Sequence, residues 1–352
     1  MRIAIFLPNW VGDAVMATPA VYALRERYPA AHFIGVVRPY VAGVLEGSYW
    51  FNELIELDPR GPLSQRTLAV ARRLRREPVD LAVLLPNSFR VAAAAWLGGC
   101  KRRVGFARYG RGPLLTDALE PQRDKSGQFV PRPVLLDYNR VAEAAGATPT
   151  LKMQLFTTPR DEAAAEAVWR STGVADRREV ILLNPGAAFG AAKHWPAESF
   201  ADLARRLAER RGSGVLVLCG PAERELAREI AKRADHPHVH ALSDFPPSVG
   251  LTKACVRRAD LLITTDSGPR HFAAAFDRPV VTLFGPTHVA WTETFHPLAV
   301  HLQKQVECGP CQRRVCPTDH RCMTTLRPDE VFSAAARLLA RSPSHRRERY
   351  AA

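Results

Sequence analysis

Short apolar runs alternate along this chain with longer segments in which apolar residues recur every three or four positions. The short runs are rich in Ile, Val and Leu and end in Pro, Gly or Asp, which is typical of buried parallel strands. The segment "SFADLARRLAERRG" (199–212) has the helical spacing, with Gly212 as a stop signal. The apolar runs predict strands within residues 2–8, 32–39, 54–59, 80–86, 103–107, 180–186, 214–220, 260–266 and 279–285.

The alternation of strand and helix in both halves predicts an α/β fold with two parallel-sheet domains. Strands lapse around residues 150–176, where "TTPRDEAAAEAVWRSTG" predicts one connecting helix. A last helix is expected at about 328–341. The predicted organisation is an N-terminal domain over 1–155, a connecting helix within 156–176, a C-terminal domain over 177–340 and a basic tail over 341–352.

Charge and hydropathy narrow the choice of partner and compartment. The 352 residues include 49 Lys and Arg against 35 Asp and Glu, a net charge of +14, which favours an anionic partner such as nucleic acid, a membrane surface or a phosphorylated substrate. No apolar run approaches the roughly 18 residues of a membrane span, and the run after Arg2 stops at Pro8, too early for an export signal. We expect a cytoplasmic protein, peripheral on the inner membrane at most, with reduced cysteines.

Ligands of open parallel sheets bind at the carboxyl ends of the strands, so the residues after each run are the first candidates. In "TDSGPRH" (265–271), Ser267 and Gly268 begin a helix whose free N–H groups suit a phosphate, while Asp266 caps the helix or binds a hydroxyl. His271 lies on the same helical face as Ser267. The alternative is a capped helix without a ligand and a structural histidine.

The turn "NPGAAFGAAKHWP" (184–196) places Lys193 close to glycine-rich backbone that begins at Gly186, an arrangement that suits a diphosphate. A solvated surface lysine is the alternative. The chain has no G-x-x-x-x-G-K-[ST] and no G-x-G-x-x-G after a strand, which excludes a P-loop and weakens a nicotinamide-dehydrogenase interpretation.

Two further turns and two basic stretches carry charged residues. In "CGPAERE" (219–225), Glu223 or Glu225 could hold ribose hydroxyls, or either could be a first-turn acid of the next helix. In "NWVGDAVMATPAV", Asp13 either faces the site or caps the helix. The basic stretch "CKRRVGFARYGRG" (100–112) and "RRLRRE" (72–77) could contact RNA, or "RRLRRE" could only face water, but no RRM, KH or helix-turn-helix signature accompanies them.

The segment "ECGPCQRRVCPTDHRCM" gathers Cys308, Cys311, Cys316 and Cys322 within 15 positions. In a reducing compartment such a cluster predicts structural zinc before disulfides. The spacing is not the paired CxxC of a zinc ribbon, so a metal-free loop is an equal alternative.

Four motifs together resemble the family 9 glycosyltransferases, which include the ADP-heptose:lipopolysaccharide heptosyltransferases. These motifs are "GDAVMATPAVYALRERYP", "NPGAAFGAAKHWP", "TTDSGPRHFAAAF" and "VTLFGPT", in the family's order and strand-end context, and the likeness extends to about residue 340. The resemblance implies a GT-B fold, in which two facing Rossmann-like domains hold the acceptor on the N-terminal side and ADP-heptose on the C-terminal side.

The resemblance also implies roles for individual residues. Asp13 would be the general base and Lys193 would steady the diphosphate. Gly186, Glu223, Asp266, Ser267, Gly268 and His271 would line the donor site, with Glu223 on the ribose. Lys101, Arg102, Arg103 and Arg108 would meet the anionic lipopolysaccharide core rather than nucleic acid.

A direct, inverting displacement follows from this assignment, and no catalytic metal is expected because no two aspartates stand two positions apart as in Asp-x-Asp. The alternatives are another family 9 transferase with a different sugar or acceptor, and a non-catalytic protein that binds a sugar nucleotide or nucleic acid.

Overall fold

The computed structural model describes residues 1–341. By its internal contacts the chain forms two units, Met1–Phe156 with Ala290–Thr294, and Thr157–Val289 with the chain from Phe295 onward. Each unit contains one six-stranded sheet in which all strand pairs are parallel. The predicted fold class is therefore confirmed.

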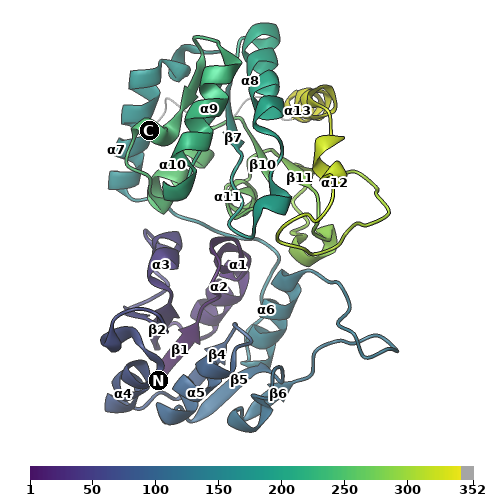
Figure 1. Ribbon diagram of the computed structural model, residues 1–352. Coiled ribbons are helices and arrows are strands. Elements are labelled where there is room, and N and C mark those ends of the chain that lie inside the picture. The colour runs from purple at the N-terminus through teal and green to yellow at the C-terminus, as the bar shows by residue number, and fades with distance from the viewer. Residues whose placement is uncertain (342–352) are drawn as a thin grey trace. The chain divides into compact units, whose positions relative to one another are not determined.

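The first unit has the strand order β3-β2-β1-β4-β5-β6. Helices α4 and α5 pack together on one face of this sheet, and α1, α2, α3 and α6 pack with one another (Figure 1). The strands are β1 Arg2–Phe6, β2 His32–Val37, β3 Glu53–Glu56, β4 Leu81–Leu84, β5 Arg102–Phe106 and β6 Asp117–Leu119. The helices are α1 Val11–Met16, α2 Thr18–Arg27, α3 Pro39–Leu45, α4 Thr67–Arg76, α5 Phe89–Leu97 and α6 Val134–Ala144.

The second unit has the order β12-β11-β10-β7-β8-β9, with α8 packed between α9 and α13 and with α10 packed against α7 and α11 (Figure 1). Its strands are β7 Val180–Asn184, β8 Gly214–Val217, β9 Val239–Ala241, β10 Leu261–Thr265, β11 Val280–Phe284 and β12 Ala299–Gln303. Its helices are α7 Pro159–Thr172, α8 Ala197–Arg211, α9 Arg224–Ala234, α10 Val249–Arg258, α11 Pro269–Ala275, α12 Arg321–Thr324 and α13 Pro328–Arg341.

Local sequence explains where the predicted helices begin and end. Thr158 and Asp161 form a reciprocal capping box at the start of α7, the predicted connecting helix, which belongs to the second unit. Gly212 adopts a left-handed conformation with φ 68° and ends α8, as the sequence predicts. Helix α13 has the predicted bounds. The predicted basic tail from residue 342 lies outside the described residues.

Among residues 1–341, none of the helices combines the length and the apolar composition that crossing a bilayer requires.

Candidate functional site

The two sheets share one topology, and this topology marks the site. In each sheet the chain builds three strands outward from the centre, then returns and builds three in the other direction. The direction reverses between β1 and β4 in the first unit and between β7 and β10 in the second. Ligands of doubly wound sheets bind where the strand order reverses, outside the carboxyl ends. Asp13 follows β1, the Lys193 turn follows β7 and Asp266 follows β10, so three predicted residues belong to these two points.

Lys193 and Asp266 form a buried ion pair at the reversal point of the second unit. The Nζ of Lys193 lies 2.5 Å from Oδ2 of Asp266 and donates a second hydrogen bond, 3.0 Å long, to the Asp266 carbonyl oxygen. Burial alone would raise the pKa of Asp266, but the charges of Lys193 and Arg270 and the hydrogen bonds that it accepts lower the pKa to about 2. Asp266 is therefore a carboxylate throughout the physiological range.

Two residues that sequence reasoning missed complete the surroundings of Asp266. Thr287 donates from Oγ1 to Oδ2 at 2.7 Å, and Arg270, which is 3% exposed, donates to Oδ1 at 3.3 Å. Arg270 stands four residues after Asp266, where an ion pair on a helix face is expected, and Thr287 belongs to the "FGPT" turn after β11. Two cations and one hydroxyl group therefore hold the Asp266 carboxylate.

Ser267 and Gly268 stand at the start of α11, as predicted, with Gly268 at the N-cap position. The Ser267 hydroxyl accepts a hydrogen bond from Asn184 at 2.8 Å and lies 3.1 Å from the Thr264 hydroxyl. Asn184 ends β7 and Thr264 lies in β10, so this hydroxyl network ties the carboxyl ends of the two central strands together. The Ser267 side chain therefore holds the turn after β10 in place.

His271 lies inside the second unit and is 3% exposed. Burial, and next the charge of Arg270, hold its pKa well below the usual 6.5, so the ring is neutral. Its Nδ1 makes no hydrogen bond within residues 1–341. Because His271 is buried, it supports the surroundings of Asp266 from inside the second unit.

The structure brings Gly186 and Glu223 together. The Glu223 carboxylate accepts the Gly220 N–H at 2.9 Å and lies so close to Gly186 that a Cβ there would be 2.0 Å from Oε1. The Gly186 carbonyl in turn accepts from Thr265 at 2.7 Å. Glu225 pairs with Arg228 and leaves most of its side chain in solvent. Of the two glutamates, Glu223 is the one beside the Lys193 turn's first glycine.

The cysteine-rich loop packs on the Lys193 turn. The Ala192 N–H donates to the Arg314 carbonyl at 3.0 Å, and His320 Nε2 lies 2.7 Å from the Ala192 carbonyl oxygen. Gly190 fits only because it lacks a side chain, since a Cβ would lie 2.4 Å from the Arg314 carbonyl oxygen. The loop thus holds the Lys193 turn in place, in addition to the contact of Lys193 with Asp266. The sequence of the loop did not predict this role.

The predicted zinc site receives no support from this loop geometry. Within residues 1–341 no three or more His, Cys, Asp or Glu side chains form a group that could hold a metal ion. Cys308 is exposed and Cys322 is buried. Burial, followed by the charges of Cys316, Cys308 and Cys311, raises the pKa of Cys322. Zinc stays a prediction, which elemental analysis tests.

Asp13 lies in the first turn of α1, the third residue after the N-cap Trp10, so it is not the helix cap that the sequence left open. Its charge acts on two tyrosines: it raises the pKa of Tyr138, after the larger effect of burial, and contributes less to the raised pKa of Tyr40. Tyr138 comes from α6, which packs against α1, and Tyr40 comes from α3. Asp13 therefore lies in a half-buried setting with phenol groups nearby.

The four predicted acceptor-binding cations separate into two groups. Lys101 precedes β5 and Arg102 and Arg103 begin it, at the amino edge of the sheet, opposite the edge that carries Asp13. Their charges are also engaged, by Asp80 at 2.8 Å, by Asp117 at 2.8 Å and by backbone carbonyls. The structure thus separates these three residues from Asp13, and their contact with the acceptor stays a prediction. Arg108 follows β5 and therefore lies at the carboxyl edge of the sheet, the edge that also carries Asp13.

Around Arg108 the structure places an aromatic and cationic cluster that the sequence did not reveal. The guanidinium carbons of Arg108 and Arg123 lie 3.7 and 4.3 Å from the centre of the Phe129 ring. Arg111 is fully buried and donates to the carbonyls of Leu84, Pro86 and Phe106, and burial lowers its pKa to about 10. Arg111 thereby anchors the carboxyl ends of β4 and β5 beside this cluster.

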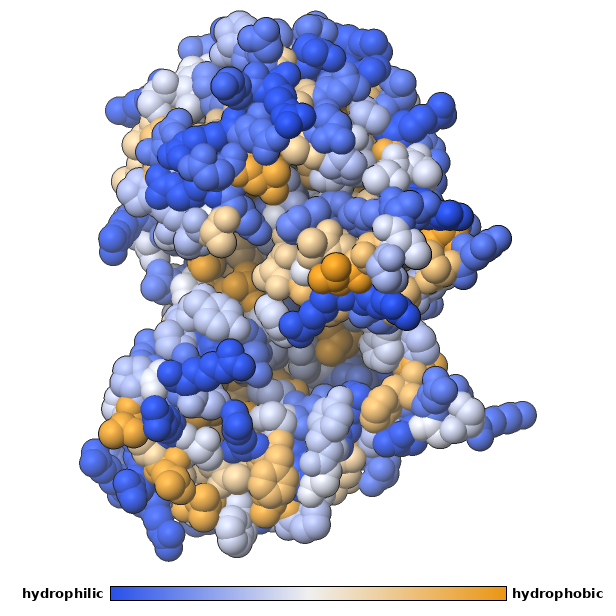
Figure 2. All heavy atoms as spheres, viewed as in Figure 1, coloured by the Kyte–Doolittle hydropathy of each residue, from blue (hydrophilic) through white to orange (hydrophobic). Residues whose placement is uncertain are grey.

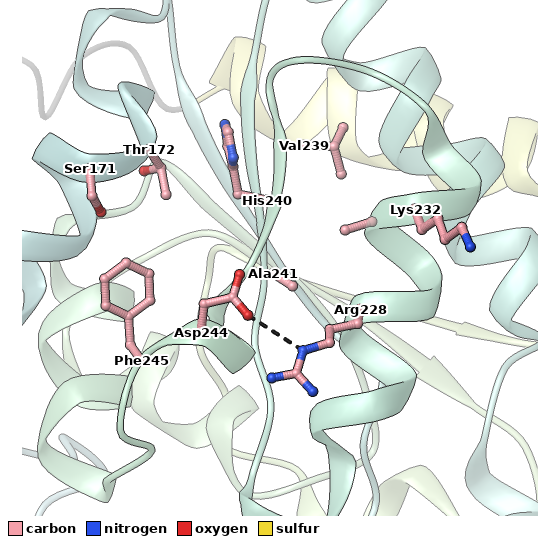
Figure 3. A pocket seen from close by; sticks show the side chains of 10 residues that line it. Ser171, Thr172, Arg228, Lys232, Val239, His240, Ala241, Asp244 and Phe245 are labelled. Carbon is pink, nitrogen blue, oxygen red and sulfur yellow. Dashed lines mark hydrogen bonds and ion pairs between the residues drawn. The ribbon is translucent and has the colours of Figure 1, made fainter.

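A cavity of about 500 Å³ lies at the edge strand β9, between α7 and α9, and none of the predicted site residues lines it (Figure 3). Its residues are Ser171, Thr172, Arg228, Ala231, Lys232, Val239, His240, Ala241, Asp244 and Phe245. Arg228 faces Asp244 across it, at 3.4 Å, and also pairs with Glu225.

Comparisons with known proteins identify the family to which this chain belongs. Residues 67–321 match glycosyltransferase family 9 (heptosyltransferase). Lipopolysaccharide heptosyltransferase 2 of Salmonella typhimurium is 30% identical over 83% of this chain and 85% of that protein. Lipooligosaccharide heptosyltransferase 2 of Campylobacter jejuni is 28% identical over 97% and 99%.

Among solved structures, Escherichia coli ADP-heptose lipopolysaccharide heptosyltransferase II superposes with a TM-score of 0.78 at 23% identity, over 98% of this chain and 100% of that one. This likeness shows that the two proteins share a fold over 98% of this chain. The family match covers well over half of the chain. The protein is therefore a glycosyltransferase, and the chain belongs to glycosyltransferase family 9.

Proposed function

We propose that this enzyme transfers heptose from ADP-heptose to the heptosyl-Kdo2-lipid A inner core of lipopolysaccharide, with inversion and without a catalytic metal. The observation that carries the proposal is the buried Lys193–Asp266 pair at the reversal point of the second sheet. The names of the Salmonella and Campylobacter relatives supply the acceptor class, and the name of the Escherichia coli neighbour supplies the donor.

In the proposed reaction the Asp13 carboxylate takes the proton of one acceptor hydroxyl. The hydroxyl oxygen attacks the anomeric carbon of the donor, and the bond from that carbon to the diphosphate oxygen breaks as the new glycosidic bond forms. ADP leaves with the electron pair. Attack from the face opposite the leaving group inverts the anomeric centre.

The leaving diphosphate needs positive charge, and Lys193 with the N–H groups at the start of α11 would supply it. Asp266 would hold Lys193 in place rather than bind the anion, because its carboxylate stays charged. Glu223 beside Gly186 would accept hydrogen bonds from the ribose hydroxyls. The lack of Asp-x-Asp in the chain supports a reaction without a diphosphate-bridging metal.

The test is release of ADP from ADP-heptose with and without heptosyl-Kdo2-lipid A, followed by mass spectrometry of the lipid. We expect acceptor-dependent release and a lipid heavier by one heptose. UDP-glucose and ADP-glucose serve as control donors. Transfer from a control donor at the same rate, or release that ignores the acceptor, would contradict the proposal.

A further inference from the structure

Helices α4 and α5 present an outer surface of the first unit that the proposed reaction does not use. The two helices pack against each other, and Val70 and Leu74 of α4 share one apolar core with Val91 and Ala95 of α5. Their outward residues therefore face the same side of the sheet. We call this outer surface the α4/α5 face.

Apolar side chains protrude from the α4/α5 face. Trp96 stands seven positions after Phe89, which puts both on one side of α5, and each is 52% exposed. Leu68 on α4 is 59% exposed, and Leu63 in the short turn before α4 is 73% exposed. Large apolar groups gathered on a surface in this way mark an interaction site.

The same face is strongly cationic. Residues 59–76 contain six arginines and no Asp or Glu, and residues 87–100 add Arg90, again without an acid. Arg72, Arg75 and Arg76 are exposed and form no ion pair within the described part of the chain. Figure 2 shows hydrophobic and hydrophilic spheres interspersed over the part of the first unit where α4 and α5 lie.

We propose that the α4/α5 face docks on an anionic lipid bilayer. The arginines would attract the anionic headgroups, and Trp96, Phe89 and the two leucines would enter the interface, where tryptophan prefers to lie. Single-stranded RNA is the rival partner for arginines and aromatic rings. The protruding leucines favour the bilayer, because an aliphatic side chain cannot stack on a base.

The position of the α4/α5 face adds a reason for a lipid partner. Phe89 begins α5 directly after the turn that follows β4, and β4 pairs with β1. This end of the face therefore lies at the same edge of the sheet as Asp13. A surface that held the first unit against a bilayer here would keep this edge close to lipid headgroups. The docking proposal concerns binding alone and does not depend on the proposed reaction.

Co-sedimentation with vesicles tests the proposal. The wild-type chain is mixed with vesicles of phosphatidylcholine and phosphatidylglycerol at 3:1, or of phosphatidylcholine alone. Two double variants probe the face: Arg72→Glu with Arg75→Glu, and Leu68→Ser with Trp96→Ser. The matched control is Arg160→Glu with Arg337→Glu, two exposed arginines on α7 and α13 of the second unit.

We expect binding to the anionic vesicles only, weakened by high salt. The charge variant should bind about tenfold more weakly or worse, since each basic residue near an anionic surface adds about 1 kcal/mol. The apolar variant should also lose affinity, and the control should stay within about twofold. Unchanged melting temperatures exclude misfolding as the cause, because all exchanged side chains are exposed.

Three outcomes would overturn the proposal. One is no binding to anionic vesicles, and another is an equal loss in the control variant. The third is tight binding of a fluorescent uridine 20-mer that the arginine variant abolishes while the Leu68 and Trp96 variant retains full vesicle binding. That result would assign the arginines to nucleic acid. Since ADP release is measured separately, failure here leaves the proposed reaction untouched.

Discussion

At the residue scale, Lys193 has a structural partner and a proposed chemical role, and two substitutions separate them. Lys193→Ala should lower kcat by about 10²–10³, the loss expected for one preorganised charge. It should also destabilise the fold by about 3 kcal/mol, because Asp266 is left buried without its closest cation. Adding Asp266→Asn should restore most of the stability but none of the turnover. Turnover that returned with stability would make Lys193 structural only.

Asp13 allows an equally clean separation. Asp13→Asn removes a carboxylate from the first turn of α1, which costs about 0.3–1 kcal/mol through the helix dipole. An Asn side chain cannot take up the proton of the attacking hydroxyl group. Turnover should therefore fall by about 10²–10⁴, while the affinity for ADP-heptose stays near normal. Calorimetry with the donor and steady-state kinetics measure the two effects. A variant that keeps its kcat assigns proton removal to another residue.

His271 predicts a pH dependence of stability. The folded chain keeps this ring neutral, whereas the unfolded chain binds a proton on it below about pH 6.5. Protonation therefore favours the unfolded state, and stability should fall by about 1.4 kcal/mol for each pH unit below 6.5 until the folded ring also titrates. Urea unfolding between pH 7 and 5 should show a shallower decline in His271→Gln. Parallel declines would remove His271 as the cause.

The sequence revealed these residues one at a time but not their contacts. Asp13, Lys193 and Asp266 stand out because each follows an apolar run. The Lys193–Asp266 pair spans 73 positions, and no local pattern encodes a contact at that separation. The sequence also did not predict that Arg111 and Arg123 lie near Arg108. The partners of these two cations are an aromatic ring and backbone carbonyls, which no sequence pattern identifies.

At the scale of elements, the turn after β7 depends on a missing side chain. Gly186→Ala should push the Glu223 carboxylate away, because the two would otherwise overlap. If Glu223 holds the ribose, the substitution should raise the KM for ADP-heptose by about tenfold, the cost of one lost charged hydrogen bond, with little change in kcat. Glu223→Gln should act similarly, and the double variant should be little worse than either. Additive effects would show that Gly186 acts through another contact.

The sequence did not predict the strands that have the shortest or most polar sequences. The nine predicted strands are present, while β6, β9 and β12 were missed. All three are edge strands, and their sequences are short or polar, such as "DAL" and "VHA". A central parallel strand is buried on both faces and needs a continuous apolar run, whereas an edge strand does not. Sequence periodicity therefore finds the centre of a sheet first.

At the scale of the whole molecule, the two parallel-sheet units follow from the sequence, but their shared strand order does not. The order depends on which face each crossover helix covers, and this choice is made by packing between distant segments. The order matters for function because it places Asp13 and the Lys193–Asp266 pair at the two reversal points. The cysteine-rich loop shows the same limit, since its packing on the Lys193 turn is a tertiary contact.

Chelation tests both metal predictions on the intact protein. EDTA should leave the transfer rate unchanged, because the proposed stabilisation of the diphosphate comes from Lys193 and backbone N–H groups. Elemental analysis before and after chelation measures zinc in the same samples. Zinc near one equivalent, lost together with thermal stability, would assign it to the cysteine-rich loop. A rate that vanished with the fold intact would instead contradict the metal-independent reaction.

The composition of the first unit has a consequence for how the chain is made. Ala290–Thr294 belongs to the unit that otherwise ends at Phe156. On a ribosome that adds about 5–20 residues per second, this segment emerges on the order of ten seconds after the rest of its unit. The first sheet is complete well before then, since all its strands precede residue 120. Until Ala290–Thr294 has been synthesised, the surface of the first unit that this segment contacts stays exposed. We expect chaperones to have the longest access to the nascent chain at this surface.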